Sequence, residues 1–238
     1  MKDSKTLLAE SADILCKNDS DAESLIAPDK ERIIALLCRY IKEIETFNPA
    51  YGLVGTTDSN ELIIKHILDS IAPLGIINRL IKEVNTKAQR NKEEKGGFIK
   101  IADAGSGAGL PGIPLAIALP ECSFTLIERM GRRAGFLLNT KAALALSNIN
   151  IEESELEKCN SQFDLITFRA FKPIEPKLLK TLLKLLAPGG IIAAYKGKRE
   201  KIEAEMASLQ GAFPAWEAIP CTVPFLDEER NLLVIRQN

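Results

Sequence analysis

The chain has 238 residues, enough for one large domain or for a compact domain with an extension. Its 46% hydrophobic and 26% charged residues are typical of a globular protein and exclude disordered and collagen-like chains. The chain has 31 Lys and Arg residues and 32 Asp and Glu residues, so its net charge is -1. Binding to nucleic acid would therefore need a local basic patch.

The cysteines indicate neither a disulfide framework nor a zinc site, because five scattered residues form no Cys-x-x-Cys pair. We therefore expect reduced thiols and no bound metal. No segment reaches the roughly 18 apolar residues of a membrane span, and residues 1–19 lack the apolar core of a signal peptide. These features predict a cytoplasmic protein without a membrane partner.

Residues 1–96 are predicted to form a helical N-terminal extension that packs on the rest of the chain. The segment Lys30–Phe47 follows Asp29, a candidate N-cap, and carries apolar residues on one stripe at helical spacing. The stripe consists of Ile33, Leu37, Tyr40, Ile41 and Ile44. Residues 82–97 are strongly polar, so we place the domain boundary at their end.

A second helix is predicted between Asp58, whose side chain can cap it, and Pro73, which ends it. On this helix His66, Asp69 and Ser70 are spaced so that they share one side. His66 is the only histidine of the chain, and it could serve as a catalytic base or as a hydrogen-bonded packing residue. We assign no chemistry to it.

Residues 97–238 alternate between short apolar strands and helical patterns, which predicts a mostly parallel, doubly wound α/β sheet. The expected strands are 98–104, 123–127, 148–151, 163–168 and 191–195, and the expected helices are 110–118, 131–145, 175–186 and 198–209. Two last strands, 215–223 and 231–236, are joined by a short polar loop and predict an antiparallel hairpin. This ending favours a Rossmann-like class I methyltransferase sheet over a dehydrogenase.

The segment Ile101–Gly112 reads IADAGSGAGLPG, a strand that ends on Asp103 and runs into a glycine-rich turn. Glycines at Gly105 and Gly107 allow a ligand to lie against bare backbone at the carboxyl edge of the sheet. Glu128 ends the next strand about 20 residues later, where a carboxylate can accept both ribose hydroxyls. The pattern predicts an adenosine-containing ligand.

The identity of this ligand depends on Asp103, because Gly107, Gly109 and Gly112 also match the GxGxxG pattern of nicotinamide cofactors. A carboxylate before the turn would repel a pyrophosphate but suits the ammonium of a methionine moiety. S-adenosylmethionine (SAM) is therefore favoured. If Asp103 instead only caps the turn, an NAD-dependent oxidoreductase remains open.

Five segments in this order closely resemble the bacterial RsmG family, also called glucose-inhibited division protein B. They are HILDS (His66–Ser70), DAGSGAGLPGIPLAI (Asp103–Ile117), LIERMGRRAGFLL (Leu126–Leu138), FRAF (Phe168–Phe171) and YKG (Tyr195–Gly197). The resemblance implies a SAM-dependent enzyme that methylates N7 of guanine 527 in the decoding-region loop of 16S rRNA, with the small ribosomal subunit as partner. A non-catalytic ribosome-assembly factor is the alternative.

The resemblance also implies which residues bind SAM: Gly105 and Leu110 in the turn, Leu156 and Glu157 after the third strand, and Arg169 after the fourth. Leu156 would border the adenine and Glu157 would accept from its exocyclic amine. Arg169 would position cofactor and RNA without acting as a base, since N7 carries a lone pair and no proton. We expect a monomer.

Three departures from the usual family pattern affect the adenine side, the exit of the fourth strand and the N-terminal junction. Glu155 stands where the family usually has Arg, Phe168 where it has a small hydroxyl residue, and Gly52-Leu53-Val54 where it has Asn-Leu-Thr.

Basic residues follow the second and fifth strands, at the carboxyl edge of the predicted sheet. We predict phosphate contacts, which position RNA without reading its sequence, at Arg132, Arg133, Lys196 and Arg199. A solvated helix face would give the same pattern.

Overall fold

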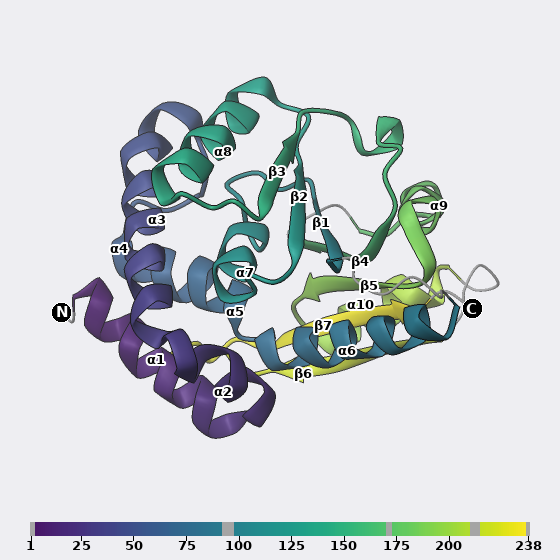
Figure 1. Cartoon of the computed structure of the whole chain (residues 1–238), viewed down its shortest axis with the longest axis horizontal. Helices are drawn as coiled ribbons and strands as arrows, with labels where there is room; N and C mark the ends of the chain where they lie inside the picture. The colour runs from purple at the N-terminus through teal and green to yellow at the C-terminus, as the bar shows by residue number, and fades with distance from the viewer. Residues whose placement is uncertain (1–2, 92–97, 170–172, 210–214, 237–238) are drawn as a thin grey trace.

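A seven-stranded sheet forms the centre of the described part of the chain, which comprises residues 3–91, 98–169, 173–209 and 215–236 of a computed structural model (Figure 1). Its strand order is β3-β2-β1-β4-β5-β7-β6. The strands are β1 Lys100–Ala104, β2 Ser123–Ile127, β3 Ile149–Glu152, β4 Phe163–Arg169, β5 Leu186–Lys196, β6 Trp216–Cys221 and β7 Arg230–Arg236. Neighbours among β1 to β5 pair in parallel, whereas β7 pairs antiparallel with both β5 and β6. The predicted doubly wound sheet with its terminal antiparallel hairpin is confirmed.

The helices before the sheet are α1 Ser4–Asn18, α2 Ser20–Ile26, α3 Lys30–Tyr51, α4 Ser59–Leu62, α5 Asp69–Ile71 and α6 Leu74–Asn91. A short 3-10 turn η1, Ala27–Asp29, precedes α3, and a π-helical segment η2, Ile63–Leu68, joins α4 to α5. The helices within the sheet region are α7 Gly112–Ala118, α8 Gly131–Leu144, η3 Leu156–Lys158, α9 Pro176–Leu185 and α10 Arg199–Ala207. None of the helices in these described segments is long and apolar enough to cross a membrane.

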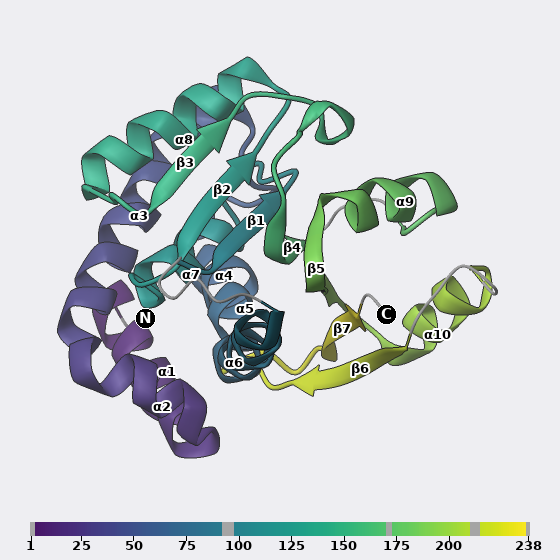
Figure 2. The same cartoon turned by 45° about the vertical axis from the view of Figure 1, so that its right-hand side comes forward.

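The two faces of the sheet are covered by separate hydrophobic clusters, because successive side chains of a strand point to opposite sides. Ile101 and Leu165 belong to the face covered by α3, α6, α7 and α8, whereas Ala102 and Ile166 belong to the face covered by α9 and α10 (Figure 2). The carboxyl ends of β1, β4 and β5 meet at one edge between these layers, which is where ligands bind in such sheets.

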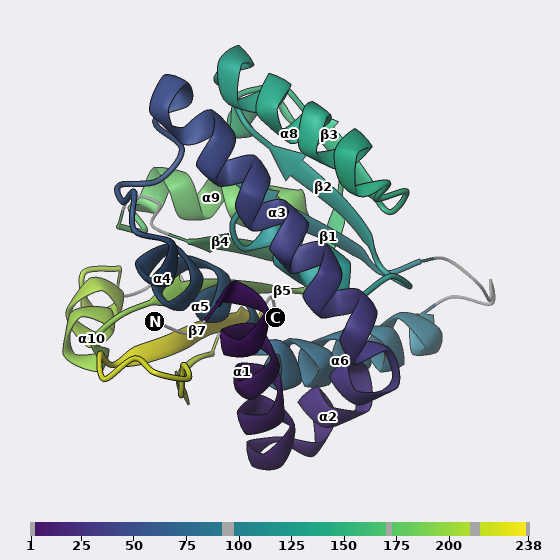
Figure 3. The same ribbon diagram turned by 90° about the vertical axis from the view of Figure 1, so that its left-hand side faces the viewer.

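The N-terminal helices share their core with one face of the sheet. A single cluster of buried residues runs from Leu7 in α1 to Val234 in β7, and α3 lies along α8 and beside α7 (Figure 3). The hydroxyl of the fully buried Tyr40 donates to the carbonyl of Ala108, in the turn after β1, at 2.6 Å. The predicted boundary between residues 96 and 97 adjoins residues 92–97, which lie outside the described residues.

The helix starts were predicted with mixed success. Asp58 caps α4 as expected, since its carboxylate accepts from the Glu61 N–H at 2.7 Å. Asp29 is the N-cap residue of α3 as expected, but its carboxylate accepts from Arg32 and makes no capping hydrogen bond to the backbone.

Candidate functional site

The glycine turn between β1 and α7 needs glycine for two different reasons. Gly105, Gly107 and Gly109 have positive φ angles of 70°, 59° and 92°, which other residues rarely adopt. A Cβ on Gly109 would lie 2.4 Å from Ile113 Cδ1, whereas a Cβ on Gly107 would meet nothing closer than 3.9 Å. Gly109 therefore packs the turn against α7, and Gly107 leaves its outer side open.

Asp103 braces this turn from inside. The residue is fully buried, and its Oδ2 accepts from the Ser106 hydroxyl at 2.6 Å and from the Gly112 N–H at 3.0 Å. Burial raises the pKa of this carboxyl to about 6. Its Oδ1 is buried without a partner among the described residues, and such an oxygen can be satisfied by an ammonium group or a bridging water. Asp103 thus caps the turn, and only Oδ1 remains for the ligand contact that we expected.

Glu128 links the turn to the start of α8. Its Oε2 accepts from the Gly107 N–H and its Oε1 from the Met130 N–H, both at 2.9 Å. Each carboxylate oxygen has a second lone pair, so these bonds orient Glu128 and leave it able to accept from ribose hydroxyls.

A pocket of about 940 Å³ opens at the carboxyl edge of β1, β2 and β4. Five of the predicted cofactor residues line it: Gly105, Glu128, Leu156, Glu157 and Arg169. Asp103, Gly107 and Leu110 do not, although Gly107 fixes Glu128 and the buried Leu110 packs behind the turn. The lining also includes Met130, Lys177 and Leu178, which the sequence pattern did not single out.

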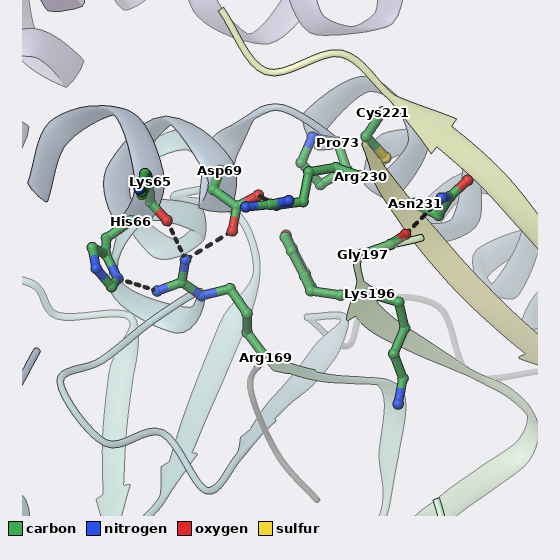
Figure 4. A pocket seen from close by; sticks show the side chains of 11 residues that line it. Lys65, His66, Asp69, Pro73, Arg169, Lys196, Gly197, Cys221, Arg230 and Asn231 are labelled. Carbon is green, nitrogen blue, oxygen red and sulfur yellow. Dashed lines mark hydrogen bonds and ion pairs between the residues drawn. The ribbon is translucent and has the colours of Figure 1, made fainter. Parts of the chain in front are cut away.

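Arg169, at the end of β4, is held by three partners from the helical N-terminal region. Its Nη1 donates to the Lys65 carbonyl at 2.9 Å and to Asp69 Oδ2 at 2.8 Å, and its Nη2 lies 3.1 Å from His66 Nδ1 (Figure 4). The Arg169 and Asp69 side chains are only 12% and 9% exposed. Burial, and then the Arg169 charge, lower the pKa of His66 to about 4, so the imidazole is neutral near pH 7. His66 and Asp69, which lie on the same side of the helix, thus hold the guanidinium of Arg169 in place.

A second cavity of about 380 Å³ lies on the other side of Arg169, and Arg169 is the residue that lines both cavities. It is enclosed by the η2–α5 helix, the ends of β4 and β5, and the β6–β7 hairpin (Figure 4). The sequence did not reveal this cavity, because its walls come from segments more than 150 residues apart.

Two of the four predicted RNA contacts join α8 to the end of α3. Arg132 Nη1 donates to the Ala50 carbonyl at 3.3 Å, and its guanidinium lies 5.8 Å from the Tyr51 ring centroid. Arg133 Nη2 donates to the Gly52 carbonyl at 3.3 Å, and Arg133 lines the larger pocket.

The other two predicted contacts lie beside α10. Lys196 is mostly buried and pairs with Glu205 at 2.7 Å, which turns its ammonium toward this helix. Arg199 is exposed and pairs with Glu203 at 2.9 Å. Arg132 and Arg199 are exposed, whereas Arg133 and Lys196 are partly buried, and all four stay predicted phosphate contacts.

The three departures occupy distinct environments. Glu155 is exposed, lines the larger pocket and pairs with Lys158 at 3.2 Å. Phe168 is 1% exposed and belongs to the core of the α9 face. Gly52 ends α3 at a φ of 59°, which glycine adopts without strain.

Comparison with known proteins assigns the chain. The family described as rRNA small subunit methyltransferase G, or GidB, matches residues 33–233. The chain belongs to this family. A ribosomal RNA small subunit methyltransferase G of Treponema denticola is 38% identical over 221 residues, covering 87% of each chain, and one of Treponema pallidum (strain Nichols) is 40% identical over 208 residues, covering 85% of each.

Solved structures resemble the chain more distantly. The N-methyltransferase NodS of Bradyrhizobium japonicum, solved with S-adenosyl-L-homocysteine, matches with a TM-score of 0.46 and 22% identity, covering 66% of this chain and 87% of that one. Family membership nevertheless fixes the class: the sheet is that of a class I SAM-dependent methyltransferase, and SAM is the cofactor. The oxidoreductase alternative is thereby excluded.

The larger pocket fits SAM in its donor and acceptor set. Glu128 can accept from the ribose, and Leu156 and Glu157 line the side expected for adenine. Asp103 is fully buried and does not line the pocket, so the contact expected between its unpartnered Oδ1 and the amino-acid end stays a prediction. Among the described residues no group of three or more His, Cys, Asp or Glu side chains could hold a metal ion.

Proposed function

We propose that this protein methylates N7 of a guanine in 16S rRNA, guanine 527 by resemblance, within the small ribosomal subunit. The relatives named above are ribosomal RNA small subunit methyltransferases, which supports the coarse substrate class. This activity would be carried out in the cytoplasm, by a monomer.

The observation that carries the choice of atom is the absence of a usable base around the second cavity, among the residues that the structure describes. Burial lowers the pKa of His66 to about 4, and its Nδ1 accepts from Arg169 Nη2. Burial raises the pKa of Cys221 to about 12 and that of Tyr195 well above 10. Asp69 is engaged by two guanidinium groups. Such a site suits a nucleophile that needs no deprotonation, and guanine N7 has an available lone pair.

Positioning is therefore the main catalytic contribution of the chain. When bound, SAM supplies an electrophilic methyl group on its sulfonium. Arg169 stands at the boundary of the two cavities, where it can fix the geometry of both reactants, and Asp69 and His66 hold its guanidinium in place. Alignment of this kind can lower a barrier by roughly 7 to 11 kcal/mol, whereas a misplaced guanidinium would lose much of it.

Mass spectrometry of small-subunit rRNA from cells with and without the gene tests the proposal. We expect one 7-methylguanosine to disappear when the gene is deleted and to return when the purified protein and SAM are added to the deficient subunits. If assembly of the subunit is restored by a variant that transfers no methyl group, the chain acts as a non-catalytic assembly factor instead.

A further inference from the structure

The second cavity has the size and position of a subsite for a single planar group. It encloses about 380 Å³ and is lined by Lys65, His66, Asp69, Pro73, Arg169, Tyr195, Lys196, Gly197, Cys221, Arg230 and Asn231. Because it shares Arg169 with the larger pocket, the two cavities adjoin each other at this residue. Methyl transfer between the cavities requires the acceptor atom to come within about 3 to 3.5 Å of the methyl carbon, so the base has to reach past the Arg169 side chain.

Tyr195 lies on one side of the cavity and is fixed in place. The hydroxyl of Tyr195 donates to the Ser70 carbonyl at 2.9 Å, so the ring at the end of β5 is held against the α5 helix. Pro73 and the thiol of Cys221 add further uncharged surface. Because Tyr195 is only 8% exposed, it offers a base a contact at the side of the cavity rather than an open ring face.

The opposite wall presents cationic donors around one carboxylate. Asp69 accepts from Arg169 at 2.8 Å and from Arg230 Nε at 3.1 Å, so one buried negative charge is shared by two positive ones. Arg230 is further fixed by the Glu229 carbonyl and by Glu228 (Figure 4 shows the two guanidinium groups on either side of Asp69). Of the five donors of a guanidinium, each arginine keeps two without a partner among the described residues.

These donors discriminate between the purines. The edge of guanine that carries N7 also carries the O6 acceptor, whereas adenine has an N6 amino donor at that place. A free N–H of Arg169 or Arg230 can donate to O6, but it would face the amino group of adenine with a second donor. A positive, donor-rich wall therefore accepts guanine and rejects adenine.

We infer that this cavity is the acceptor-base subsite, which takes one guanine turned out of the RNA strand, holds it beside Tyr195 and Pro73 and contacts its O6 with Arg169 or Arg230. The inference rests on the proposed function, and it assigns a specificity role to Arg230. Asp69 is then a positioning residue, because it pairs with both Arg169 and Arg230.

Filling the cavity tests the inference. Cys221→Phe places a ring inside it, whereas Pro220→Phe places the same ring on the exposed neighbouring position of β6 and serves as the matched control. Transfer of labelled methyl from SAM to rRNA is measured together with the Kd for SAM. We expect Cys221→Phe to lower kcat/KM for RNA at least about tenfold with the SAM Kd within about twofold of wild type, and Pro220→Phe to retain wild-type transfer. Equal transfer by both variants overturns the inference.

A second measurement uses the unmodified protein, in case Cys221→Phe does not fold. The Kd is compared for three rRNA fragments that differ only at the target nucleotide, which is guanosine, 7-deazaguanosine or an abasic site. We expect guanosine and 7-deazaguanosine to bind alike, since both retain O6, and the abasic fragment to bind roughly tenfold or more weakly. Equal affinity for all three overturns the subsite. The proposed function is tested separately by identifying the methylated atom of the product. A methyl group on an atom other than N7 contradicts the proposed function, whereas the comparison of methyl transfer by the two variants still tests the subsite.

Discussion

Removing the Tyr40 hydroxyl should loosen the glycine turn without disturbing the core. Tyr40 is fully buried on α3, and its hydroxyl donates to the Ala108 carbonyl at 2.6 Å. Tyr40→Phe keeps the ring but leaves this carbonyl, in a residue that is only 4% exposed, without its donor. A hydrogen bond contributes about 0.5 to 1.5 kcal/mol net, and an unsatisfied buried acceptor costs about 1 to 3 kcal/mol. We expect the free energy of unfolding to fall by about 1 to 2 kcal/mol.

Urea denaturation followed by circular dichroism measures this change. Tyr51→Phe is the matched control, since Tyr51 is half-buried on the same helix and its hydroxyl has no hydrogen-bond partner among the described residues. Ala108 lies between Gly107 and Gly109, so the affinity of Tyr40→Phe for SAM should also fall, as measured by calorimetry. Unfolding free energies of Tyr40→Phe and wild type that agree within about 0.5 kcal/mol would refute the view that this bond ties the N-terminal helices to the turn.

Four further outcomes are expected. Gly109→Ala should lower the melting temperature, because its Cβ would lie 2.4 Å from Ile113 Cδ1 at a φ of 92°. Gly135→Ala in α8 should instead stabilise the fold by up to about 1 kcal/mol, because its Cβ would have no atom within 4 Å. Gly107→Val should lose SAM binding in calorimetry yet keep a cooperative unfolding transition, and NAD should bind neither protein. Arg199→Glu should weaken RNA binding and reduce its salt dependence by about one unit of log-log slope, with the SAM Kd unchanged. The pKa of His66 is about 4 in the folded protein and about 6.5 in the unfolded chain, so between pH 6.5 and 4 the unfolded chain binds more protons. Lowering the pH over this range should therefore destabilise wild type more than His66→Gln. The single-turnover methylation rate should stay flat from about pH 7 to 8.5.

The strands and the cofactor edge were predictable because they depend on local patterns. The bounds predicted for β2 agree with Ser123–Ile127, and the turn after β1 could be placed from its glycines. The start of β5 was missed: the strand begins at Leu186, five residues early, because Ala187-Pro188-Gly189-Gly190 has the composition of a turn. The polar segment 82–97 was compatible with a solvated helix end or a linker, and the structure shows a helix end, since α6 continues to Asn91.

The partners of charged groups could not be predicted, because they depend on which elements meet in space. Sequence spacing placed His66 and Asp69 on one side of a helix, but it did not show that Arg169, about 100 residues later, lies between them. The same limit applies to Lys196, which was expected to face RNA. Its position after β5 was right, but Glu205 from α10 takes up its charge.

The helical N-terminal region contacts both the glycine turn and the start of α8, beside the larger pocket. Arg132 and Arg133 follow β2, where basic residues predicted phosphate contacts, yet both donate to the carbonyls that end α3, at Ala50 and Gly52. A helix C-terminus leaves carbonyls unsatisfied and carries partial negative charge, so a guanidinium placed there is stabilising. Since the same Arg133 lines the larger pocket, the end of α3 sets the position of one pocket wall, as Tyr40 does for the turn. A change in the extension should therefore alter SAM affinity even where it touches neither SAM nor RNA.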